Sequence, residues 1–224
     1  MTTLAARPRQ AWLTPLVHVA ALAPLVWIGV DALSGGLTVN PIQELTSRTG
    51  KIALVLLMLS LACTPLHALL GMPRLLKLRR PLGLYAFLYA ALHLLVFAVL
   101  DNGLDWEIIL ETVFEKRFAL VGFAAFVILT PLAVTSTKWW QKQLGKRWKL
   151  LHKLVYVAAS LAILHFILLV KSLALRPEPL VWGFVLAILL IARAPFIRRQ
   201  FVAMHNRFAR PVRIPSQPVS GRKD

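Results

Sequence analysis

Six long apolar segments, separated by short charged connections, constrain this chain more than any other feature of its sequence. They cover roughly residues 11–33, 51–71, 81–100, 118–134, 150–171 and 179–197. An apolar helix of ~20 residues is long enough to cross the ~30 Å hydrocarbon core of a bilayer. The sequence therefore predicts an all-α membrane protein, with a six-helix bundle at 11–197 between a short N-terminal segment (1–10) and a basic tail (198–224).

The distribution of charge predicts how this bundle is oriented. The formal net charge is +17, which in a soluble protein would suggest binding to nucleic acid. Here the charges lie between the apolar segments. With a cytoplasmic N-terminus, 20 of the 26 Lys and Arg residues fall on the cytoplasmic side and eight of the nine Asp and Glu residues on the other. Because Lys and Arg favour the cytoplasmic side, we predict that both termini are cytoplasmic and that the chain meets lipid rather than nucleic acid.

Histidines are the strongest candidates for a functional site, because ionisable side chains inside a membrane are costly and usually functional. The one cysteine, Cys63, lies inside an apolar segment and offers neither a disulfide nor a cysteine-based metal site. His93 lies 13 residues after Arg80. His165 lies 12 residues after Lys153. Both segments are predicted to run outward from the cytoplasm, so at ~1.5 Å per residue the two imidazoles are expected at one depth, ~18–20 Å past the basic edge.

Three kinds of site fit this pair of histidines. A b-type heme takes axial imidazoles from facing helices. Core histidines that are hydrogen-bonded to neighbouring helices would look the same in sequence. A proton channel or small transporter without heme, using the histidines as a relay, is the third. Alanines near both histidines would make room for a porphyrin or allow close helix packing: Ala86, Ala90, Ala91, Ala158, Ala159 and Ala162.

The remaining histidines give weaker signals. His152 lies 13 residues before His165, which places the two ~140° apart around an ideal helix. The spacing alone therefore does not show a second site. His67, at the inner end of the second apolar segment, could reach the same layer as His152, whereas His18 fits a packing role. We find no internal repeat in the sequence beyond the helical pattern.

Several stretches nevertheless resemble a known family. They are Arg80-Pro-Leu-Gly-Leu-Tyr-Ala-Phe-Leu-Tyr-Ala-Ala-Leu-His93, Leu132-Ala-Val-Thr-Ser-Thr137, Leu144-Gly-Lys-Arg-Trp-Lys-Leu-Leu-His152-Lys-Leu-Val-Tyr156 and Leu164-His165. The first resembles the third helix of the ferric reductase-like transmembrane family. Together they are similar to the MsrQ (YedZ) family, over about residues 45 to 195.

The resemblance implies a function. MsrQ proteins are heme-binding subunits of the bacterial inner membrane. They pass electrons from the quinone pool or a cytoplasmic flavin reductase to a periplasmic molybdopterin-dependent methionine sulfoxide reductase, which repairs oxidised proteins. By matching positions, His93 and His165 would be axial ligands of heme b, and His152 the candidate ligand of an inner layer. The family also implies FMN, and substrate catalysis is expected on the partner. A purely structural membrane anchor is the remaining alternative.

Two features depart from the wider superfamily. Its two-heme members carry a second histidine 13 or 14 residues before the third-helix ligand, where this chain has Arg80 and Arg79. Arginine stays protonated and is not an ordinary axial ligand, so the resemblance implies one heme or two. After Phe196 only 28 residues remain, too few for a dinucleotide-binding unit of ~30 residues. We therefore expect the electrons to come from a quinol or a separate reductase.

Overall fold

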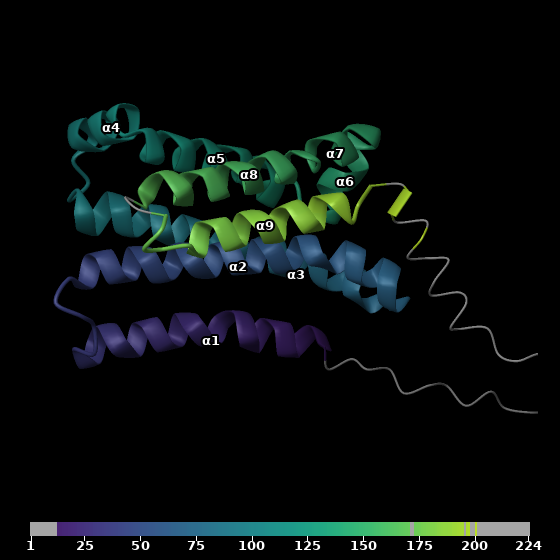
Figure 1. Ribbon diagram of the computed structural model, residues 1–224, viewed down its shortest axis with the longest axis horizontal. Coiled ribbons are helices and arrows are strands. Elements are labelled where there is room, and N and C mark those ends of the chain that lie inside the picture. Colours follow the sequence, from purple (N-terminus) through teal and green to yellow (C-terminus); the bar gives the residue numbers. More distant parts are fainter. Residues whose placement is uncertain (1–12, 171–172, 195, 198–199, 201–224) are drawn as a thin grey trace, which may run out of the picture.

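The computed structural model describes residues 13–170, 173–194, 196, 197 and 200, which form helices joined by turns. Its long helices lie side by side along one axis (Figure 1). They are α1 (Leu13–Ser34), α2 (Pro41–Leu70), α3 (Arg74–Leu95), α5 (Arg117–Val134), α8 (Leu154–Leu169) and α9 (Glu178–Ile191). The all-α prediction is confirmed for this part of the chain. The N-terminal segment 1–10 and nearly all of the tail 198–224 lie outside the described residues.

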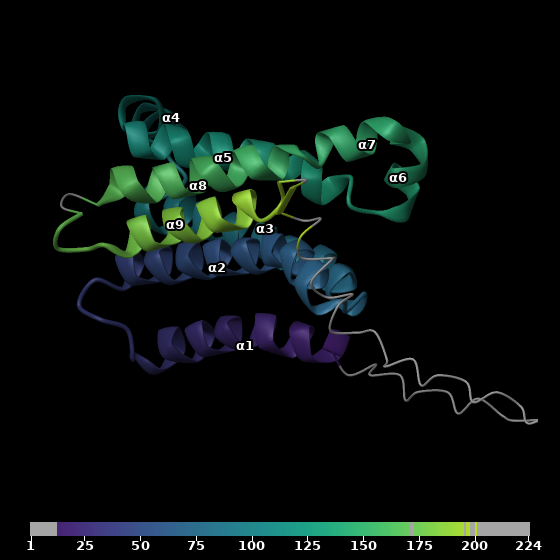
Figure 2. The same ribbon diagram turned by 45° about the vertical axis from the view of Figure 1, so that its right-hand side comes forward.

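Four short elements cap the two ends of the bundle. A π-helix, η1 (Val96–Asp101), continues α3, and α4 (Trp106–Glu115) follows it. At the opposite end lie α6 (Lys138–Leu144) and α7 (Lys146–Leu151), which project beyond the long helices (Figure 2). Both caps therefore come from the segments that connect α3 to α5 and α5 to α8.

Five helical stretches are long and apolar enough to cross a membrane, so the chain is a multi-pass membrane protein. They are Leu13–Ser34, Pro41–Leu70, Arg74–Asp101, Arg117–Val134 and Lys146–Leu169. The sixth predicted span forms α9, but its 14 residues extend only ~21 Å, short of the ~30 Å hydrocarbon core. The predicted count of six spans is thus supported for five, and the sixth segment is a shorter apolar helix.

The second helix begins ten residues before the predicted start of its apolar segment. Asn40 accepts a hydrogen bond from the backbone N–H of Gln43, and Pro41 occupies the first helical position. Both residue types favour helix starts, because Asn satisfies an otherwise unpaired amide and proline has no amide to satisfy. Gly71 ends the helix in the left-handed conformation, with φ +64°. The polar first turns of α2 therefore extend the helix without adding to its apolar length.

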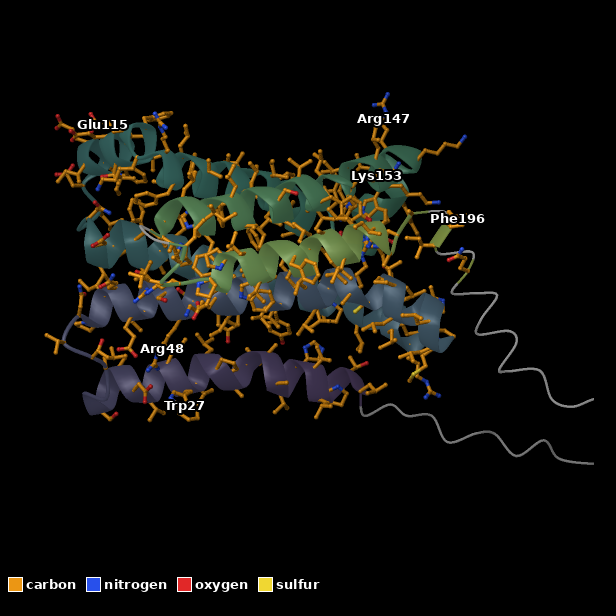
Figure 3. The ribbon with its side chains drawn as sticks, in the orientation of Figure 1. Trp27, Arg48, Glu115, Arg147, Lys153 and Phe196 are labelled. Atoms are coloured by element: carbon orange, nitrogen blue, oxygen red, sulfur yellow. The ribbon has the colours of Figure 1, made fainter. Side chains whose placement is uncertain are left out.

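Charge is sorted between the two ends of the bundle. The acidic end, as we call the end with α4, carries all the Asp and Glu residues among the described residues: Asp31, Glu44, Asp101, Asp105, Glu107, Glu111, Glu115 and Glu178. Arg48 bridges Asp31 and Glu44 there, and Lys51 pairs with Glu178 at 2.9 Å. The basic end carries α6 and α7, with Arg147 and Lys153 at the opposite pole from Glu115 (Figure 3). The two signs of charge separate as the sequence predicts.

Helix α1 is the outermost of the long helices and is tied to α3 by two polar contacts. Tyr89 on α3 is fully buried and donates to the carbonyl oxygen of Ala21, 2.7 Å away. His18 shares a hydrogen bond of 2.8 Å with the hydroxyl of Tyr85. Much of the rest of α1 is exposed, with apolar side chains such as Trp27 at its surface, as expected for a helix that faces lipid.

The orientation can be tested with single cysteines in a Cys63→Ser background. Asp105→Cys lies at the acidic end and Lys142→Cys at the basic end, and both native side chains are exposed. With the basic end in the cytoplasm, a membrane-impermeant maleimide added to spheroplasts is expected to label only Asp105→Cys. Labelling of Lys142→Cys is expected after permeabilisation. The reverse pattern would show that the bundle is inserted the other way round.

Candidate functional site

Two histidines on different helices meet near the acidic end of the bundle. His93 lies on α3 and His165 on α8. Their ring centroids are 6.1 Å apart and their planes are inclined by 82°. The two imidazoles therefore lie side by side at one depth, as the spacing from the basic residues predicts. Neither ring is fully buried.

His93 is fixed by a contact with α2. Its Nδ1 lies 2.8 Å from the carbonyl oxygen of Thr46. A carbonyl can only accept, so Nδ1 carries the proton and donates it. Gly50 stands one helical turn after Thr46, and a Cβ atom there would lie 3.0 Å from Nδ1. The missing side chain lets the imidazole approach the backbone of α2.

His165 repeats this arrangement against α5. Its Nδ1 donates to the carbonyl oxygen of Phe118, 2.7 Å away. Gly122 follows one turn later, and a Cβ atom there would lie only 2.6 Å from Nδ1 and 2.9 Å from Cε1. Real Cβ atoms do not come this close, so only glycine is compatible with this position of the ring.

The two hairpins α2–α3 and α5–α8 thus hold their histidines in the same way. In each, the accepting carbonyl lies 47 residues before the histidine. The glycine lies 43 residues before it in both. The two hairpins therefore share the spacing and the contacts of their histidines, although their sequences show no internal repeat beyond the helical pattern.

The shared hydrogen bond decides which nitrogen each ring offers. With Nδ1–H engaged by a carbonyl, the lone pair sits on Nε2, which is the arrangement usual for metal-bound histidines. Metal–imidazole bonds are ~2.0–2.1 Å long, which sets the centroids of two imidazoles on opposite sides of one metal about 6–6.5 Å apart. The observed 6.1 Å is within that range, so His93 and His165 would be suited to hold a heme iron between them.

The described residues contain no group of three or more His, Cys, Asp or Glu side chains that could hold a metal ion by themselves. A heme needs only two protein ligands, since the porphyrin supplies the other four. The donor set of His93 and His165 is therefore sufficient for heme iron but not for a metal site built from side chains alone.

The alanines near these histidines serve mainly helix packing. Ala158 and Ala159 are completely buried and Ala86 nearly so. Small residues of this kind let transmembrane helices approach closely.

The π-helix η1 begins three residues after His93, and such segments often occur at functional sites.

The structure does not bring the other histidines into this pair. His152 stacks on Trp148, with centroids 4.0 Å apart, and its Nδ1 lies 3.1 Å from the Trp148 carbonyl oxygen. Among the described residues it makes no hydrogen bond with His67, whose buried Nδ1 has no partner. His18 bonds to Tyr85 instead.

Four residues that contact the two histidines escape reasoning from the sequence. Thr46 and Phe118 act through backbone carbonyls, which every residue has, so their types give no signal. Gly50 and Gly122 are isolated glycines inside apolar helices. The one available signal is that each precedes its histidine by the same number of residues.

The sequence of this chain is similar to those of known proteins. The model of the family "Ferric reductase like transmembrane component" matches residues 49–163, which include His93, Gly50 and Gly122 and end two residues before His165. Three similar curated proteins each bear the name protein-methionine-sulfoxide reductase heme-binding subunit MsrQ. That of Bordetella parapertussis is 46% identical over 79% of this chain and 85% of its own length. That of Rhodospirillum rubrum is 45% identical over 82% and 88%. That of Xanthomonas axonopodis pv. citri is 44% identical over 78% and 82%. The chain belongs to the ferric reductase-like transmembrane family and, within it, to the MsrQ family.

Proposed function

We propose that this chain is a membrane electron-transfer subunit that holds a b-type heme between His93 and His165. The observation that carries the proposal is the separation of the two rings, 6.1 Å, together with the hydrogen bonds that leave both Nε2 atoms free. The relatives in the MsrQ family are named as heme-binding subunits of a methionine sulfoxide reductase, which supports the same function.

The protein's own residues orient the ligands and exclude water. The carbonyls of Thr46 and Phe118 fix the tautomer and rotation of the two imidazoles and raise their basicity. Tyr89 on α3 and Ala159 on α8, which precede the two histidines on the same helices, are fully buried. A heme bound here would supply an iron that gains and loses one electron, with a potential set by the axial ligands and their burial.

The direction of transfer is also part of the proposal. The basic end would face the cytoplasm of a bacterial inner membrane, with both termini there, and the acidic end the periplasm. Electrons would enter from a quinol or a cytoplasmic flavin reductase. They would leave to a periplasmic molybdopterin-dependent methionine sulfoxide reductase, whose catalytic subunit performs the substrate chemistry. His93 and His165 lie toward the acidic end, which suits a site that hands electrons outward.

An inner layer of cofactors completes the proposal. His152 is the candidate ligand of a second heme by the family resemblance; its Nδ1 lies 3.1 Å from the Trp148 carbonyl oxygen, and the backbone of Leu132 is a second hydrogen-bond partner of the ring. No second histidine lies against it in the described structure, so such a heme would lack the paired ligation of the outer site. An FMN is proposed from the family resemblance alone.

A proton relay through His93 and His165 is the weaker alternative. A relay needs each imidazole to accept a proton on one nitrogen and release it from the other. Here each Nδ1 proton is held by a backbone carbonyl, and a carbonyl does not pass a proton on. This hydrogen bonding favours ligands over carriers.

The direct test is a dithionite-reduced minus oxidised absorption spectrum of the purified protein, expressed with ample heme supply. A b-type Soret band and α-band are expected, with a pyridine hemochrome assay giving the heme-to-protein ratio. A ratio near one is expected for the site at His93 and His165 alone, and a ratio near two would require a second site, for which His152 is the candidate ligand. A spectrum without heme would refute electron transfer by this chain.

A further inference from the structure

Two arginines approach each other at the basic end, where α2, α3, α8 and α9 meet. Arg193 follows the last turn of α9 and donates hydrogen bonds to the hydroxyl of Tyr156 and to the carbonyl oxygen of Leu61. Its guanidinium carbon also lies 4.9 Å from the centroid of the Tyr156 ring. The side chain is therefore drawn inward against α2 and α8 rather than out to water.

Arg79 on α3 lies beside the same part of α2, because the hydroxyl of Ser60, the residue before Leu61, donates to the Arg79 carbonyl oxygen at 2.8 Å. Arg79 is close enough to Arg193, His152 and Cys63 for its charge to act on all three. The described part of the chain offers its side chain no hydrogen bond and no ion pair. Arg79 is partly buried, whereas its neighbour Arg80 is exposed. Arg193 is thus held by polar contacts, whereas the nearby Arg79 side chain has no polar partner among the described residues.

These charges have no counter-ion among the described residues. Every described carboxylate lies at the acidic end, where Asp31, Glu44 and Glu178 are already paired. A guanidinium cannot lose its proton in a protein. Partly buried like charges are poorly screened by salt, and a buried charge without an opposite charge is strongly destabilising. The pair of arginines therefore favours a bound anion.

Unsatisfied polar atoms gather at the same end. Three buried side-chain atoms in the described structure lack a hydrogen-bond partner: Arg193 Nε, Thr64 Oγ1 and His67 Nδ1. Thr64 and His67 lie on the last two turns of α2, one and two turns beyond Leu61. Buried polar groups are nearly always paired, so each exception calls for an explanation. A ligand with several acceptor oxygens would pair the Arg193 donor and balance the two charges.

We propose that the region between Arg79 and Arg193 binds a phosphate group. Phosphate matches the planar donor fork of arginine and accepts two parallel hydrogen bonds from it. Basic sites between helices on the cytoplasmic side of membrane proteins bind anionic lipid headgroups, and a flavin nucleotide carries the same chemical group. This site requires no heme at His93 and His165, so the two proposals can fail separately.

The test uses the full-length protein in nanodiscs of pure phosphatidylcholine. In one arm phosphatidylglycerol is added in increasing proportion, and lipid retained after transfer to detergent is measured by native mass spectrometry. In the other arm FMN is titrated and its fluorescence quenching is followed. The wild type is compared with Arg79→Gln, which deletes a charge but no described hydrogen bond. Arg80→Gln, an exposed arginine one residue along the same helix, is the matched control.

The wild type and Arg80→Gln are expected to bind in one arm with equal affinity, and Arg79→Gln at least about tenfold more weakly, as for loss of a charged phosphate contact. The arm that responds identifies lipid or nucleotide as the source of the phosphate. Arg193→Gln is expected to weaken binding similarly, and Arg79→Lys to an intermediate degree. If Arg79→Gln does not fold, these two variants provide the test of the proposal instead. Equal affinity of all folded variants in both arms, or no binding in either, would overturn the proposal.

Discussion

Substituting alanine for His93 or for His165 is expected to remove most of the heme absorbance while the protein still inserts into the membrane. Each substitution deletes one of the two nitrogens proposed to hold the iron, and the remaining imidazole would hold heme from one side only. Because the long apolar helices are unchanged, insertion does not depend on either ring. The measurement is the pyridine hemochrome value per mole of purified protein.

His18→Ala is the matched control for these variants. His18 is also an imidazole inside an apolar helix, but its ring meets Tyr85 and lies outside the pair. Its heme content is expected to equal that of the wild type. His152→Ala reports on the inner layer: a loss of about half the heme would indicate a second site. Wild-type heme content in both His93→Ala and His165→Ala would show that the ligands have been assigned wrongly.

Gly122→Ala is expected to lower heme content by roughly tenfold or more, in the range found when groups that orient metal ligands are altered. The added Cβ would lie 2.6 Å from Nδ1 of His165, so the ring must move. Moving it breaks the hydrogen bond to the Phe118 carbonyl and turns Nε2 away from the iron. A change of one methyl group, at a residue that is not itself a ligand, would thus disable the site.

Two further glycines separate this steric effect from a general loss of stability. Gly50→Ala places its Cβ 3.0 Å from Nδ1 of His93, so a smaller loss is expected. Gly29→Ala meets nothing within 4 Å and should leave heme content unchanged. Alanine favours helix over glycine by up to ~1 kcal/mol, so Gly122→Ala is not expected to unfold α5. Wild-type heme binding by Gly122→Ala would show that the ring is not held where we describe it.

Sequence reasoning worked where one physical cause dominates. The hydrocarbon thickness sets the length of a spanning helix, so the apolar segments locate α1, α5 and α8 closely, whereas α3 begins seven residues before the predicted start of its segment. The high cost of charge in lipid sorts Asp and Glu residues from Lys and Arg residues, which orders the two ends. Counting residues from a basic edge placed His93 and His165 at one depth, because the helical rise is constant.

It failed where the cause is a contact between distant segments. The approach of His165 to Gly122 depends on how α5 packs against α8, and no local pattern encodes that packing. His67 and His152 make no hydrogen bond with each other in the described structure, and the spacing of the two residues in sequence carries no signal of that. The start of α2 at Pro41 was missed because capping, rather than apolar character, sets that boundary.

The carbonyl contacts of His93 and His165 also bear on how fast an electron can move. Every electron transfer requires the atoms around the redox centre to adjust, and the energy of that adjustment slows the step. Imidazoles already held by a carbonyl, and bordered by helix backbone at a glycine, have little freedom to shift when the charge on the iron changes. The two hairpins would therefore keep this reorganisation energy small on both sides of a bound heme, which suits a membrane electron-transfer subunit.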